Sequence, residues 1–213
     1  GLSFIDCQFD GDVVLRESTV RGDVNFAGAQ FHSGADFQGM QVRGQQFDFS
    51  GSLFKTAAKF QRIDVLPNAS FRQAKLEEGA DFQRATFRSD LMMGALESEG
   101  YLGLNSVHVL GGTYMNMAKV EARMLANNAH FHSAFDMVRT SVADNLSFQN
   151  TIFAGRTRMM DITVNKPVDF SGAQFTQARP VVFKFDTDNA VRQQFILSGH
   201  KKPLLDLPLI KKI

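Results

Sequence analysis

The chain has 213 residues, 44% of them hydrophobic, and a formal net charge of +1 from 23 Lys and Arg against 22 Asp and Glu. This length fits one domain or one repeat array. The balanced charge argues against a protein that binds nucleic acid through bulk charge, and equally against an acidic mimic of nucleic acid. No apolar run reaches the roughly 18 residues of a membrane-spanning helix. The single cysteine, Cys7, excludes an internal disulfide, and we expect a cytoplasmic protein.

Phenylalanine dominates the aromatic residues, with 21 Phe against 2 Tyr and no Trp. Because the Phe ring has no polar group, it can be buried from every side without a hydrogen-bond partner. From Phe4 onward an apolar residue recurs every 11 residues, with one extra residue near positions 44–46, and this spacing gives 16 units. These lead positions are Phe4, Leu15, Phe26, Phe37, Phe49, Phe60, Phe71, Phe82, Met93, Leu104, Met115, Ala126, Met137, Phe148, Met159 and Phe170.

A second apolar column lies five residues after each lead, and 16 of the 21 Phe occupy one of the two columns. Residues two before and three after each lead are mostly apolar or small. Inward positions therefore come in pairs two residues apart, which is the period of a β-strand, and the odd step between pairs indicates a corner. An 11-residue repeat can also form a coiled coil, but the abundant Phe, β-branched and turn residues are unsuited to a helix. The sequence predicts stacked short strands.

The second column alternates between Phe and Val, as at Phe31 and Val42, and the residue two places earlier compensates in volume. Close packing explains this compensation, since small-plus-large and medium-plus-medium pairs fill similar space. We infer that two units make one coil of 22 residues, so that the 16 units give eight coils. The alternation slips between Leu76 and Phe87, and we expect a local irregularity there.

Several segments of five residues begin with a small or apolar residue, continue with Asp and Phe, and end with two polar or small residues. They are 35–39 (ADFQG), 80–84 (ADFQR) and 168–172 (VDFSG). In this pattern the chain resembles the pentapeptide-repeat proteins over about residues 1–177. The resemblance implies an all-β fold, a right-handed, four-sided β-helix with the central and the small residues inside. Because each unit here is one residue longer than two pentapeptides, we expect one corner of each half-coil to bulge.

Two regions depart from the pattern. Residues 92–125, where Met and Leu replace Phe, allow a continued solenoid with a Met-packed core or an exposed loop or site, and we favour the solenoid because the register persists. We assign residues 1–177 to the solenoid and residues 178–213 to a C-terminal cap helix, begun by Asp186 or Asp188, and an extended tail. No equivalent cap precedes the first unit, which suggests truncation or end-to-end pairing.

Histidines give one candidate metal site. His108 and His130 are 22 residues apart, so we expect them on adjacent coils about 5 Å apart, with His132 pointing outward beside His130. Three imidazoles on one patch can bind a metal ion. The alternative is three solvated side chains, because no Cys or carboxylate completes a recognisable ligand set. We predict no metal, no cofactor and no catalytic residue.

Other polar groups have ordinary structural interpretations. An Asp column precedes several leads and could be taken for paired carboxylates, but it is spread along the whole repeat, whereas catalysis needs a local, shielded cluster. Its members are Asp36, Asp48, Asp81, Asp136 and Asp169. Arg156, Arg158 and Lys166 form a small basic patch, which we interpret as a solvated face. Cys7 falls in an inward column and is interpreted as a small core residue.

The sequence favours a non-enzymatic scaffold or protein-interaction module with an unidentified protein partner. Some pentapeptide-repeat proteins protect DNA gyrase by mimicking duplex DNA, and the resemblance makes such inhibition of a nucleic-acid enzyme an alternative that the balanced charge disfavours. A third hypothesis is a soluble repeat domain of a larger membrane-associated protein. We do not expect an enzyme or a nucleic-acid partner, and an end-to-end homodimer is left open.

Overall fold

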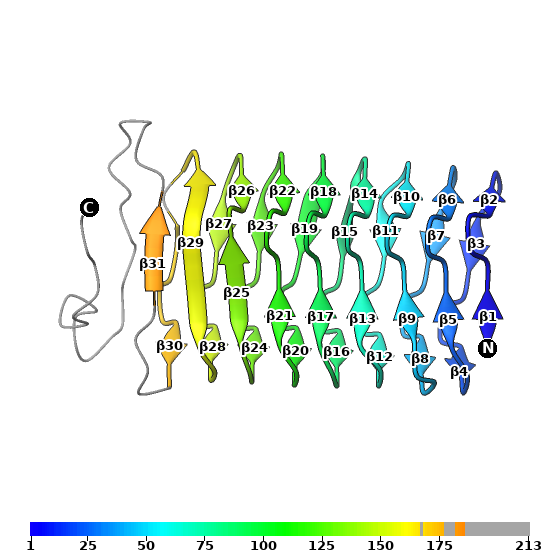
Figure 1. The fold of residues 1–213 in the computed structure, drawn as a ribbon, viewed down its shortest axis with the longest axis horizontal. Helices are drawn as coiled ribbons and strands as arrows, with labels where there is room; N and C mark the ends of the chain where they lie inside the picture. Colours follow the sequence, from blue (N-terminus) through cyan, green and yellow to red (C-terminus); the bar gives the residue numbers. More distant parts are fainter. Residues whose placement is uncertain (167, 177–181, 186–213) are drawn as a thin grey trace.

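The computed structural model describes residues 1–166, 168–176 and 182–185. In this part of the chain every regular element is a strand, and the strands wind into a right-handed parallel β-solenoid of about eight coils (Figure 1). Each of the first seven coils contains four strands, and each of these strands pairs in parallel with its counterparts in the neighbouring coils. The predicted fold class and the predicted coil of two units are therefore confirmed.

Four faces result, and we number them in the order in which each coil visits them. Face 1 contains β1 (Leu2–Ser3), β5 (Val24–Asn25), β9 (Phe47–Asp48), β13 (Ala69–Ser70), β17 (Leu91–Met92), β21 (Thr113–Tyr114), β25 (Phe135–Val138), β29 (Thr157–Val164) and β31 (Val182–Phe185). Face 2 contains β2 (Gln8–Phe9), β6 (Gln30–Phe31), β10 (Leu53–Phe54), β14 (Lys75–Leu76), β18 (Glu97–Ser98), β22 (Lys119–Val120) and β26 (Ser141–Val142).

The other two faces follow the same order. Face 3 contains β3 (Val13–Val14), β7 (Ala35–Asp36), β11 (Ala58–Lys59), β15 (Gly79–Asp81), β19 (Tyr101–Gly103), β23 (Met124–Leu125) and β27 (Leu146–Ser147). Face 4 contains β4 (Thr19–Val20), β8 (Gln41–Val42), β12 (Asp64–Val65), β16 (Thr86–Phe87), β20 (His108–Val109), β24 (His130–Phe131), β28 (Ile152–Phe153) and β30 (Gln174–Phe175). The long strand β29 pairs with β25 on face 1 and with β26 on face 2, so it joins these two faces.

The pairing register follows the 22-residue coil, as in Phe54 opposite Leu76. The extra residue near positions 44–46 lengthens one turn, so that Val24 pairs with Phe47. The carboxylate of Asp23 holds this longer turn, because its Oδ1 accepts hydrogen bonds from the backbone N–H groups of Gln45 at 2.7 Å and Gln46 at 3.2 Å. The insertion is thus absorbed at a corner and leaves the strands in register.

Corners alternate between two kinds. After most lead residues the chain makes a tight turn in which the backbone N–H of the residue three places later donates to the carbonyl of the lead, as from Ala29 to Phe26 at 3.0 Å. At this corner only two residues lie between the buried lead Phe26 and the next buried residue, Ala29. At the following corner three residues lie between the buried Phe31 and the buried Ala35. The eleventh residue of each unit is therefore accommodated at one corner in each half-coil, as predicted.

Stacked Phe rings fill the N-terminal half of the interior. The leads on one side stack in the series Phe26, Phe49 and Phe71, with centroids 5.1 and 5.4 Å apart. The leads on the other side stack in the series Phe37, Phe60 and Phe82, at 5.0 and 4.9 Å. The two series meet edge to face, which is a favourable aromatic geometry worth about 0.5–1.5 kcal/mol per pair beyond area burial.

Residues 92–125 continue the solenoid, which confirms the interpretation that we favoured. Met93 and Met115 occupy lead positions with no exposed surface, and Leu104 between them is equally buried. The slip in the Phe–Val alternation has a simple form: the large residue moves from face 2, as at Phe54, to face 4, as at Phe87. The register does not shift there, and the local change is that β15 is three residues long.

The two ends of the described coils differ from the middle. In the first coil the inward positions are partly exposed, so that Phe4 is 37% exposed whereas the equivalent Phe26 is fully buried. At the other end β31 pairs with β29 and places Phe183 opposite Met159, with a register shift between Met160 and Ile162. The repeat pattern did not predict this strand. The expected cap helix and tail lie outside the described residues.

Candidate functional site

The Asp column serves the fold. Its members divide between faces 1 and 3, so they do not form one cluster. In Asp48, Asp81 and Asp169 the Oδ1 atom accepts a hydrogen bond of 2.8 Å from the backbone N–H two residues later. This Asx-turn satisfies an amide at the tight corner and explains why Asp or Asn recurs before the lead. Asp36 makes the same contact at 3.1 Å.

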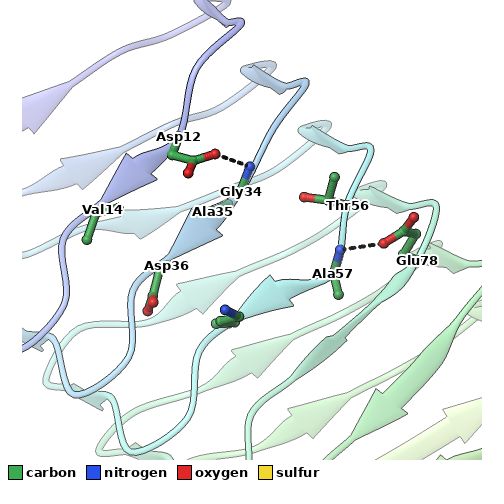
Figure 2. A pocket seen from close by; sticks show the side chains of 9 residues that line it. Asp12, Val14, Gly34, Ala35, Asp36, Thr56, Ala57 and Glu78 are labelled. Carbon is green, nitrogen blue, oxygen red and sulfur yellow. Dashed lines mark hydrogen bonds between the residues drawn. The ribbon is translucent and has the colours of Figure 1, made fainter.

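An open groove of about 350 Å³ lies on face 3 near the first coils (Figure 2). Three carboxylates line it, but each is already bonded. Asp12 accepts from the Gly34 N–H at 2.8 Å, and Glu78 accepts from the Ala57 N–H at 3.3 Å. Asp36 pairs with Arg16, whose guanidinium helps hold the pKa of that carboxyl below its usual range against the opposing effect of burial. The groove therefore offers no uncommitted acid–base pair.

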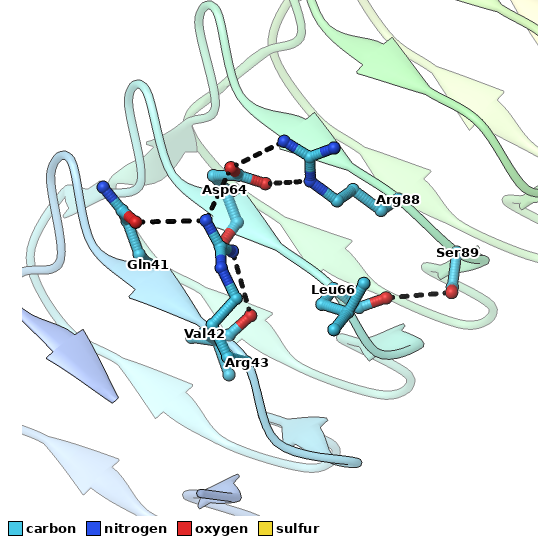
Figure 3. A network of polar contacts seen from close by, with 7 residues as sticks. All are labelled: Gln41, Val42, Arg43, Asp64, Leu66, Arg88 and Ser89. Atoms are coloured by element: carbon cyan, nitrogen blue, oxygen red, sulfur yellow. Dashed lines mark hydrogen bonds and ion pairs between the residues drawn. The ribbon is translucent and has the colours of Figure 1, made fainter. Parts of the chain in front are cut away.

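Face 4 carries an ion-pair network across three coils (Figure 3). Asp64, on β12, accepts two hydrogen bonds from Arg88, from Nε at 2.7 Å and from Nη2 at 3.0 Å. Arg43, from the preceding coil, donates to the same carboxylate at 2.8 Å and to the Asp64 carbonyl at 2.9 Å. Hydrogen bonds from Arg88 and then Arg43, with their positive charges, lower the pKa of Asp64, although partial burial opposes them.

Exposed leucines extend this network along the face. Leu66, Arg88 and Leu110 occupy the same position in successive coils, immediately after β12, β16 and β20. Their backbone N–H groups continue the strand ladder, for example from Leu110 to the Phe87 carbonyl at 2.9 Å. Leu66 and Leu110 are each 44% exposed, which places an Arg between two exposed apolar side chains.

The three histidines lie on the same face, farther along the column. His108 on β20 and His130 on β24 are paired residues in neighbouring strands, as the 22-residue spacing predicts. His132 follows β24, and its ring stacks on that of His130 with centroids 3.6 Å apart and an interplanar angle of 18°. One ligand atom from each of the three side chains lies within 4.8 Å of the other two. The structure thus brings all three candidate residues together.

The electrostatics of the cluster favour neutral imidazoles. Burial lowers the pKa of His130, and the neighbouring His132 and His108 lower it further. Burial likewise lowers the pKa of His132, with His108 contributing. The group contains no carboxylate among the described residues, so the rings have no acidic partner to stabilise their charged forms.

The remaining candidates are committed to structural contacts. Arg156 and Arg158 both donate to the Oδ2 atom of the buried Asp136, at 3.0 and 3.1 Å. Lys166 pairs with Asp144 on the neighbouring coil. The basic patch is therefore made of paired residues instead of simply solvated ones. Cys7 is a free thiol that is only half-buried, because it belongs to the partly exposed first coil.

Sequence reasoning missed the network of Arg43, Asp64 and Arg88. Its members are 21 and 24 residues apart, and they meet because Asp64 occupies a strand position while the two arginines occupy the position just after the neighbouring strands. The signal for this network lies in the outward columns of successive coils, which the 22-residue period aligns in the same way as the inward columns.

These features define the class of protein as a right-handed parallel β-solenoid with short strands on four faces. A family model described as pentapeptide repeats (9 copies) matches residues 1–44, which form the first two coils. The same pairing continues through the later coils. Over these two coils the chain is similar to pentapeptide repeats, and the fold of the later coils is consistent with the same repeat. No curated protein and no solved structure gave a significant match to it.

Proposed function

We propose that the chain is a non-enzymatic scaffold or protein-interaction module that binds a partner through face 4. One observation carries the proposal: coil stacking holds Leu66, Arg88 and Leu110 in one exposed column. Protein interfaces use apolar side chains and Arg in this combination, since Arg adds a planar donor to apolar contact area. The ion pair with Asp64 orients Arg88 beforehand, so less conformational entropy is lost on binding.

The solenoid supports this role through its rigidity. Every backbone strand is bonded to the next coil, so the outward side chains sit at a spacing of about 4.8 Å along each face. A partner with apolar residues and carboxylates at matching intervals can contact several coils at once. In the described part of the chain no helix is long and apolar enough to cross a bilayer.

Mimicry of duplex DNA has weaker support. An acidic stripe does lie on face 2, where Glu77, Glu99 and Glu121 occupy one column after β14, β18 and β22. It covers only three coils, and lysines interrupt it: Lys75 pairs with Glu99 at 3.4 Å and Lys119 with Glu121 at 2.5 Å. Duplex DNA carries one charge per about 1.7 Å of its axis, which is far denser. We therefore do not propose a gyrase inhibitor.

Affinity capture with matched variants tests the proposal. The full chain is used as bait in soluble and membrane fractions of its source, beside the variants Leu66→Ser/Leu110→Ser and Met117→Ser. Met117 is 59% exposed and lies near the first corner of its coil, so it controls for loss of exposed apolar area elsewhere. We expect a protein that free bait competes away, that the Met117 variant retains and that the face 4 variant loses. Capture of nothing but the bait would contradict the interaction-module proposal, and equal capture by all three would contradict the face 4 assignment.

A further inference from the structure

The three-histidine cluster has no structural duty that explains it. The inward neighbours of these rings, Val109 and Phe131, complete the core without them. On β12 of the same face, the outward Asp64 pairs with two arginines of opposite charge. Here three groups of the same kind face one another, and the column is flanked by the uncharged Thr86 and Ile152 on the adjoining strands.

We propose that His108, His130 and His132 form a binding site for a divalent transition-metal ion of the Zn²⁺ class. Imidazole nitrogen is a preferred ligand of Zn²⁺, Cu²⁺ and Ni²⁺, whereas Mg²⁺ and Ca²⁺ prefer oxygen. Three protein nitrogens with water in the fourth position make a complete tetrahedral Zn²⁺ site. The set is exposed enough for an ion to enter, since His108 and His132 both face solvent.

The backbone already fixes most of the required geometry. Zn–N bonds of about 2.0–2.1 Å place tetrahedral ligand atoms roughly 3.3 Å apart. The candidate atoms lie within 4.8 Å of one another, so rotations of the side chains suffice to bring them together. Parallel pairing holds the backbone of His108 beside that of His130, and the strand direction brings His132 onto the same side as His130.

Binding would tie two coils together, because His108 belongs to β20 and the other two ligands to β24 and the residue after it. A ligand that binds only the folded chain raises its stability by mass action. The bound ion thus links two neighbouring coils. Its fourth coordination position is left for a water molecule or for a donor group of a partner.

Calorimetric titration of the full chain, prepared without a histidine tag and free of metal, with ZnCl₂ tests the site. We expect one ion per monomer and a rise in melting temperature on addition of Zn²⁺. His130→Ala should weaken binding at least tenfold and abolish the rise, and His108→Asn should do the same with a polar side chain retained. His32→Ala is the matched control, because His32 lies just after β6 on face 2 and contacts Asp10 instead.

Cobalt gives an independent spectroscopic readout. Co²⁺ in a tetrahedral nitrogen site shows intense visible absorption, which we expect from the wild-type chain and the His32→Ala variant and not from His130→Ala. Several outcomes overturn the proposal: no binding, binding that survives both His130→Ala and His108→Asn, equal loss with His32→Ala, or half an ion per chain with dimer formation. Circular dichroism of each metal-free variant establishes that the solenoid is folded before titration.

Discussion

Every unit turns at a residue with positive φ, two places after the lead. Sixteen such residues occur, one for each unit, and twelve of them are not glycine. The positive φ and the hydrogen bond back to the lead carbonyl define a type II turn, which favours Gly at this position. A residue with a Cβ atom is strained there by about 1–2 kcal/mol. The solenoid accepts this strain because strands on both sides fix the corner.

The corner column predicts opposite effects for two exchanges. Met117 has φ of 58° and is 59% exposed, so Met117→Gly removes strain without loss of core packing. We expect a gain of about 0.5–1 kcal/mol in the free energy of unfolding, after the added entropy of the unfolded chain is subtracted. Gly51 has φ of 65°, and a Cβ atom added there would meet no other atom within 4 Å apart from its chain neighbours. Gly51→Ala should therefore lower the free energy of unfolding by about 1 kcal/mol through backbone strain alone. Denaturant unfolding measures both, and a stabilising Gly51→Ala would contradict this explanation.

At the scale of strands, the network centred on Asp64 links β12 with the residues that follow β8 and β16. The folded-state pKa of Asp64 is lowered, so its carboxylate stabilises the fold at pH values above the unfolded-state pKa of about 3.9. That contribution is lost as the pH falls through the folded-state value. The arginines are partly solvated, which limits the contribution to about 1 kcal/mol or less.

Asp64→Asn should therefore lower the free energy of unfolding at pH 7 and leave it unchanged in strong acid. Unfolding by urea across the acid range measures the difference between the two chains. Arg88→Gln is the second single variant of a double-mutant cycle. The free energy of unfolding of the double variant should fall by less than the sum of the decreases in the two single variants. A difference between wild type and Asp64→Asn that does not depend on pH would show that the ion pairs contribute nothing.

At the scale of the whole molecule, the period of the sequence predicted the coil, the interior and the pairing of His108 with His130. Inward residues could be predicted because burial restricts them to apolar types at a fixed spacing. The positive φ at the corners could not be predicted, because glycine is the residue that signals it and only four of the sixteen corner residues are glycine. Strand β31 was missed because its register departs from the coil: Phe183 lies opposite Met159, a separation of 24 residues (183 − 159) instead of 22.

Both proposals depend on the outward columns, which exist only if two units make one coil. Pyrene labels on paired cysteines measure this directly, in a chain carrying Cys7→Ser. Glu97→Cys and Lys119→Cys are paired on face 2, so we expect excimer emission. Glu97→Cys and His108→Cys are closer in sequence but lie on opposite faces, so we expect monomer emission only. Excimer emission from the second pair and not from the first would contradict the 22-residue coil.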